Sequence, residues 1–116
     1  PDESAENSSP ETETMKKLSL LEKIEAFIKQ AIRLKPDDAE AHYNLGVDYV
    51  KLGRWQDAVE SFKQAIRVKP DYADAHHNLG RTYLLTGDKG SALEEYKILK
   101  TLDAEQANEL FKLIYE

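Results

Sequence analysis

The chain has 116 residues, of which 41% are apolar and 33% charged, a composition that suits one ordinary domain with a modest hydrophobic core. Cysteine is absent, which excludes disulfides, thiolate metal ligands and a cysteine nucleophile. The formal charge of −6 includes five acidic residues and no base in residues 1–14, so the remaining chain carries −1 and lacks the basic excess of a nucleic-acid binder.

Residues 1–14 combine acidic residues with Ser, Thr and Pro and contain almost nothing apolar. Such a segment cannot bury enough surface to offset its ordering entropy, which predicts a disordered acidic leader. The triplet Asn7-Ser8-Ser9 matches the glycosylation pattern, and Ser9 also precedes a proline. Both patterns are short enough to arise by chance, and we interpret them as plain linker.

From Met15 the pattern becomes helical and predicts an N-terminal flanking helix over residues 15–36. Ser19 and Glu22 resemble a capping box, although the helix can begin upstream of them, and Pro36 ends it. Its apolar residues recur at helical spacing: Leu21, Ile24, Phe27, Ile28, Ala31 and Ile32.

Two helix pairs and a final helix follow. We expect the pairs over residues 39–70 and 73–102, with Gly53 and Gly87 in left-handed turns between their helices. A capping helix over 104–116 begins behind Asp103 with Gln106, and no segment alternates with period two. The predicted fold class is therefore all-α.

One phrase of the sequence occurs twice. Residues 29–46, KQAIRLKPDDAEAHYNLG, match residues 63–80, KQAIRVKPDYADAHHNLG, at 14 of 18 positions with an offset of 34. A period of 34 residues is the length of a tetratricopeptide repeat, a helix–turn–helix unit.

Individual positions carry the resemblance further. The first repeat reads His42, Leu45-Gly46, Tyr49, Ala58, Phe62 and Pro70, and the second reads His76, Leu79-Gly80, Tyr83, Ala92 and Tyr96, with Ala104 where proline would stand. From about residue 20 onward the chain resembles a tetratricopeptide-repeat (TPR) protein, with histidine in place of the family's tryptophan. The resemblance implies a right-handed superhelix of helical hairpins, an α-solenoid with two full repeats and flanking helices.

The glycines of the repeated phrase have a physical explanation. A glycine inside a helix costs up to about 1 kcal/mol relative to alanine, so its presence twice at one position indicates close packing. We expect Gly46 and Gly80 to face Ala58 and Ala92 of the partner helices.

By resemblance, the first helix of each pair lines a concave groove that binds a protein or peptide partner. Carried onto this chain, the groove also includes Glu40, Val50, Leu84 and Leu85, and the expected peptide-binding residues are Tyr43, Asn44, Val47, Lys51, Asp74, His77, Asn78 and Arg81. Asn44 and Asn78 recur one repeat apart, and an amide side chain can pair with a peptide backbone whatever its sequence. Acidic Glu40 and Asp74 and uncharged Tyr43 stand where a carboxylate clamp would need bases, so we expect backbone and apolar contacts instead.

The same residues argue against catalysis. His42 and His76 occupy a packing position, and His76 and His77 diverge by about 100° on a helix and cannot share one metal ion. No carboxylate pair lies in an apolar pocket, and TGDKG lacks the strand and Gly-Lys-Ser/Thr of a phosphate loop. We therefore predict no enzyme, no metal and no cofactor. We also expect no membrane insertion, because no apolar run is long enough and no signal peptide is recognisable, which favours the cytoplasm.

We thus predict a protein-interaction module with an adaptor or scaffold role. The terminal segment ANELFKLIYE supports an alternative, because Leu113 and Tyr115 leave its inward stripe and offer an edge for self-association into a homo-oligomer. Alternatively, these residues only cover the end of the stack. A third interpretation is an accessory domain of a larger enzyme.

Overall fold

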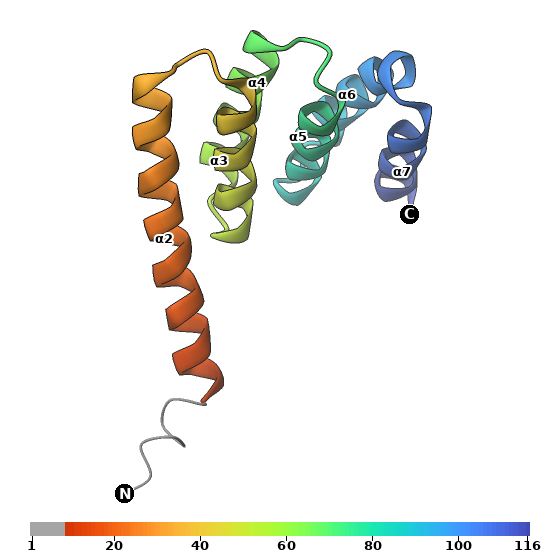
Figure 1. The fold of residues 1–116 in the computed structure, drawn as a ribbon. Helices are drawn as coiled ribbons and strands as arrows, with labels where there is room; N and C mark the ends of the chain where they lie inside the picture. Colours follow the sequence, from red (N-terminus) through yellow and green to blue (C-terminus); the bar gives the residue numbers. More distant parts are fainter. Residues whose placement is uncertain (1–8) are drawn as a thin grey trace, which may run out of the picture.

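The computed structural model describes residues 9–116, which form a stack of antiparallel α-helices (Figure 1). The predictions for residues 1–8, including most of the acidic leader and the triplet at Asn7, lie outside the described residues. Six helices occupy the described part: α2 (Pro10–Leu34), α3 (Ala39–Lys51), α4 (Trp55–Val68), α5 (Ala73–Leu85), α6 (Lys89–Leu102) and α7 (Ala104–Tyr115).

The start of α2 corrects two predictions. The helix begins at Pro10 rather than Met15, so residues 10–14 belong to it and not to a disordered leader. The Ser9 side chain caps it by accepting a hydrogen bond from the Thr12 amide at 3.2 Å, and proline suits the first helical position. Ser19 lies inside the helix, so Ser19 and Glu22 form no capping box and the alternative of a start upstream of them is the one observed. The prediction of disorder rests on the low hydrophobicity of residues 10–14, which argues against burial. A helical turn with a good cap can nevertheless form while it remains exposed.

The remaining helices pair in chain order. Helix α3 packs on α4 and α5 on α6, while α4 contacts α5 and α6 contacts α7. Gly53 and Gly87 have φ of 74° and 81° and close the hairpin turns, as predicted. Asp103 caps α7 by accepting from the Gln106 amide at 3.1 Å, which confirms the predicted start of that helix.

The hydrophobic core consists of two clusters that follow the two helix pairs. The first contains Leu45, Tyr49, Ala58, Val59, Phe62 and Leu79, with Ile28 and Ile32 of α2 packed against it. The second contains Ala92, Leu99, Ala107, Leu110 and Ile114, so α7 completes the core of the second pair. The flanking helices thus supply packing surface that two repeats lack.

The helical glycines do pack closely, but against different residues from those predicted. A Cβ on Gly46 would lie 2.6 Å from the ring of Phe62, and one on Gly80 would lie 2.6 Å from Leu110 of α7 and 3.4 Å from Glu95. Ala58 and Ala92 are not among these nearest neighbours. A large side chain of a neighbouring helix fills the space that each missing side chain leaves.

The two histidines of the repeated phrase are core residues. His42 and His76 are buried, and the Nε2 of each lies 2.8 Å and 2.7 Å, respectively, from the carbonyl oxygens of Pro36 and Pro70. The ring nitrogen of each histidine therefore ties the first helix of a pair to the turn that follows the preceding helix. This bond explains why a ring with a polar edge occupies the position.

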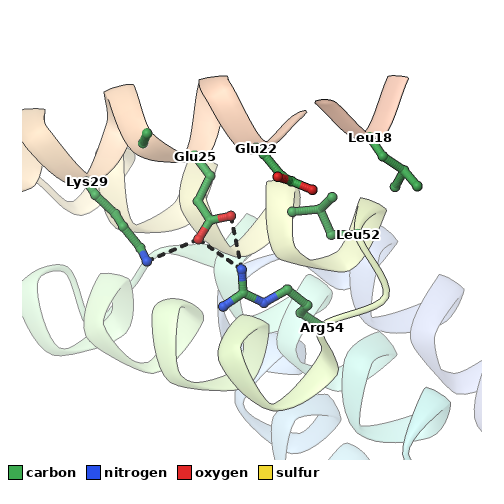
Figure 2. A pocket seen from close by; sticks show the side chains of 7 residues that line it. Leu18, Glu22, Glu25, Lys29, Leu52 and Arg54 are labelled. Atoms are coloured by element: carbon green, nitrogen blue, oxygen red, sulfur yellow. Dashed lines mark hydrogen bonds and ion pairs between the residues drawn. The ribbon is translucent and has the colours of Figure 1, made fainter. Parts of the chain in front are cut away.

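An ionic cluster joins α2 to the start of α4 (Figure 2). Glu25 is buried, and both of its carboxylate oxygens accept from Nη1 of Arg54 at 3.0 Å, while Lys29 lies 3.1 Å away. Burial alone would raise the pKa of Glu25, but hydrogen bonds with Lys29 and Tyr49 and the charge of Arg54 lower it. The pKa of Asp48 moves the other way: burial and the charge of Glu25 raise it despite the opposing charge of Lys51, and the Oδ2 of Asp48 has no hydrogen-bond partner.

Candidate functional site

A hollow of about 210 Å³ lies between α3 and α5. Its floor includes the ring of Phe62, which reaches it from α4 because Gly46 leaves room for it. The hollow is lined by Val47, Val50, Lys51, Phe62, Asn78, Arg81, Thr82 and Leu85. Four of the eight expected peptide-binding residues, Val47, Lys51, Asn78 and Arg81, therefore meet at one place.

A second hollow of about 240 Å³ lies between α5 and α7 and shares two residues with the first. It is lined by Arg81, Leu84, Leu85 and Leu113. Leu113 was not expected here, although counting from the helix caps places it at the position of Asp48 and Thr82. That position is not among the groove positions that the resemblance gives, so the sequence held no signal for Leu113, although Thr82 lines the first hollow from the same position.

Asn78 is committed to a contact within the protein. Its amide nitrogen donates to the Tyr43 hydroxyl at 2.8 Å and to the Asp74 carbonyl at 3.2 Å. Tyr43 is half-buried, with its ring centroid 5.1 Å from that of Tyr72, and burial together with the charge of Asp74 raises its pKa. The pair Tyr43–Asn78 therefore fastens α3 to α5, whatever else the amide binds.

His77 and Asp74 both contact α7. The buried His77 ring lies 3.6 Å from a carboxylate oxygen of Glu109, and burial together with the charge of Arg81 lowers its pKa. Asp74 is exposed and accepts a hydrogen bond from Gln106 at 2.9 Å. His77 was expected to face the groove, but α7 covers it.

Asn44 is exposed and lies apart from Asn78, in a hollow of about 180 Å³ between α2 and α3. Phe27, Ala31 and Glu40 line the same hollow. The two asparagines thus occupy equivalent positions in different surroundings: Asn78 is bonded to the helix before it, and Asn44 faces the side of α2.

The groove has two cations beside its apolar surface. Lys51 and Arg81 are both exposed, and within residues 9–116 neither has a carboxylate oxygen at ion-pair distance. The surface around the first hollow therefore combines apolar side chains with two positive charges available to a ligand.

The described part of the chain offers neither a metal-binding cluster nor a membrane-spanning helix. Residues 9–116 contain no group of three His, Asp or Glu side chains placed to hold a metal ion. Among the same residues, no helix combines the length and the apolar character that crossing a membrane requires.

Antiparallel helix pairs with one repeated packing scheme and a groove along their first helices define a solenoid of helical hairpins. Family models identify the kind of solenoid. The TPR repeat model matches residues 29–53 and 47–87, and the tetratricopeptide repeat model matches residues 73–106. The chain belongs to the tetratricopeptide-repeat family. This confirms the predicted family and fold class, and the family's general role is protein–protein interaction.

Solved structures agree with this assignment. A crystal structure of MamA protein is 27% identical with a TM-score of 0.76, covering 89% of this chain and 57% of the MamA chain. TTC0263, a thermophilic TPR protein of Thermus thermophilus, is 26% identical with a TM-score of 0.74, covering 83% and 50%. The TPR2B domain of yeast Sti1, in complex with pHsp70, has a TM-score of 0.76 at 24% identity, covering 84% and 82%, and shows the fold alone.

The chain spans about half the length of the MamA chains and of TTC0263. A search of curated proteins found no match to the sequence.

Proposed function

We propose that the protein binds an extended peptide segment of a partner protein along α3, α5 and α7, as an adaptor or scaffold without catalytic activity of its own. The observation that carries this proposal is the pair of adjoining hollows, which share Arg81 and Leu85 and lie on successive first helices. Two neighbouring pockets for side chains, separated by a polar group, match the way extended peptides are recognised.

The lining indicates what the peptide carries. Val47, Val50 and Leu85 favour an apolar side chain in the first hollow, and Leu84 with Leu113 favours a second one beyond Arg81. Lys51 and Arg81 favour an acidic group between or beside these anchors, because exposed cations attract opposite charge. The side-chain oxygen of Asn78 contributes an acceptor, since the side-chain nitrogen of the same amide already donates to the Tyr43 hydroxyl.

The proposal is tested by selecting from a random peptide library displayed on phage and measuring the affinity of the selected peptides by calorimetry. We expect selected peptides to combine an acidic residue with spaced apolar residues. Arg81→Glu and Leu85→Glu should each weaken them about tenfold or more, since the charge reversal and the buried charge act at the centre of the contact.

The matched control is Lys63→Glu, which makes the same kind of charge change at an exposed position of α4, away from both hollows. Circular dichroism establishes that each variant folds. The proposal fails if no peptide is enriched, or if enriched peptides bind the Arg81 and Leu85 variants as tightly as they bind the parent.

A further inference from the structure

Helix α2 has an apolar stripe that no described residue covers. We define the α2 stripe as Leu20, Ile24, Phe27, Ala31 and Leu34, whose spacing of four and three residues places them on one helix face. Phe27 and Leu34 are 77% and 79% exposed, and the other three are also exposed. The packed face of the same helix carries Ile28 and Ile32 instead.

Comparison with the equivalent helix one repeat later shows what would normally cover the α2 stripe. At the offset of 34 residues, Ile24, Phe27 and Ala31 correspond to Ala58, Ser61 and Ala65 of α4, all of which are buried. Helix α4 lies between two first helices, α3 and α5, whereas among the helices of residues 9–116 the one first helix that α2 contacts is the following one, α3. The α2 stripe is therefore the face that the first helix of its own pair would cover.

At the opposite end of the stack, a first helix stands without a second helix among the described residues. Helix α7 has the register of a first helix: counted from the residue before each helix, its Leu110 corresponds to Leu45 and Leu79, and all three are buried. No described helix follows it. Phe111, at the position of Gly46 and Gly80, and Tyr115 form what we call the α7 face; their rings contact Tyr96 and Lys89 of α6 but remain 44% and 54% exposed.

A repeated contact between successive first helices predicts how the two ends would meet. Tyr43 of α3 binds Asn78 of α5, and His77 of α5 lies 3.6 Å from Glu109 of α7; both pairs join the same two register positions. If α7 preceded α3 of a second molecule in the same stack, the residues at these two positions would be Asn108 on α7 and Asn44 on that α3. Both are exposed, and two amides can exchange hydrogen bonds.

The charges of the two ends are opposite. Helix α2 together with Lys35 carries six bases and four acids, a net +2, and residues 103–116 carry four acids and one base, a net −3. Opposite potentials favour the approach of these two surfaces, whereas two copies of either surface would repel each other.

We propose that α7 of one copy docks on α2 of a second copy, at the position before α2 where a first helix would lie and where residues 9–116 place none. The contact continues the solenoid from copy to copy, with the α7 face against the α2 stripe and Asn108 beside Asn44. Because the two surfaces differ, the contact is heterologous and leaves a free end at each side, so it produces open chains of molecules rather than a closed dimer.

The first experiment measures mass by sedimentation equilibrium from micromolar to near-millimolar concentration. We expect the weight-average mass to rise beyond twice the 13.2 kDa of one chain. Phe27→Glu on α2 and Tyr115→Glu on α7 should each weaken association about tenfold or more by placing a charge in the contact. The control is Met15→Glu, which changes an exposed residue of α2 outside the stripe and should leave association unchanged.

The deciding experiment mixes the two variants. Each retains one intact end, so the Phe27→Glu and Tyr115→Glu chains together should form a 1:1 dimer that grows no further. If either variant fails to fold by circular dichroism, Leu20→Glu and Asn108→Arg replace them at exposed positions.

Three results would overturn the proposal. The parent chain could remain at the mass of one copy throughout the range, in which case the α2 stripe serves another polypeptide. The Phe27→Glu chain alone could still form oligomers, or the mixture could stay monomeric. Peptide binding in the groove is measured separately, because Arg81→Glu leaves both end surfaces intact.

Discussion

Gly46 offers the sharpest test of the packing between α3 and α4. Gly46→Ala would place a Cβ 2.6, 2.7 and 2.9 Å from three carbons of the Phe62 ring. Phe62 is completely buried, so the ring can make room only by repacking its core neighbours or by moving into the hollow between α3 and α5, which would expose it. Overpacking a core position costs about 1–3 kcal/mol, while replacing a helical glycine with alanine returns up to about 1 kcal/mol. The expected net loss is about 1–2 kcal/mol, or roughly 5–10 °C in Tm for a domain of this size.

Thermal and urea unfolding followed by circular dichroism measures this loss, with two further variants as controls. Gly90→Ala makes the same change near the start of α6, where the nearest atom is 3.8 Å away, and should be neutral or slightly stabilising. Phe62→Leu removes the ring, so adding Gly46→Ala in that background should cost far less than it does alone. A Gly46→Ala chain as stable as the parent, or one whose loss persists fully without the ring, would refute the packing argument.

Three further changes have expected outcomes. Asp48→Thr should stabilise the protein by about 1 kcal/mol in urea unfolding at neutral pH, because it removes a buried carboxylate with an unpaired oxygen, and Thr82 at the equivalent position donates to a backbone carbonyl at 2.7 Å. Burial lowers the pKa of His76, but its bonds to Glu95 and a backbone carbonyl outweigh this and raise the pKa above 6.5. The stabilisation is therefore complete below pH 6.5 and is lost as pH rises through the folded-state value; the stability difference between the parent and Glu95→Gln should shrink in that direction. Gly53→Ala should lower stability by about 1 kcal/mol in the same unfolding assay, because alanine is strained at a φ of 74°; unchanged stability would contradict this reason.

The fold was predictable because local and global signals agree. The 34-residue offset, the turn glycines and the cap at Asp103 each specify an element without reference to distant residues, and all three are confirmed. The beginning of α2 was missed because low hydrophobicity reports on burial, whereas the Ser9 cap and Pro10 decide where an exposed helix starts.

The groove was only partly accessible to sequence reasoning. Helix position places Val47, Lys51 and Arg81 on the groove side, and the hollow between α3 and α5 is lined by all three. Position alone does not report that Asn78 bonds to Tyr43 or that α7 covers His77. Both facts depend on the rotation between consecutive pairs, which is set by side-chain packing across three helices rather than by the pattern of any one. The peptide-binding roles of these residues stay predictions.

The linear order of contacts also has a consequence for how the protein loses structure. Each helix touches only its near neighbours along the stack, and among the helices of residues 9–116 α2 packs mainly on α3, with the ion pair of Glu25 and Arg54 reaching the start of α4. The protein therefore resembles a row of coupled units more than a single cooperative globule. Amide hydrogens of α2 should exchange first and those of α4 and α5 last, so protection from exchange would rise from the edge of the stack to its middle. A partner that covers α2 would extend this protection to the edge and bind the neighbouring units into one melting transition.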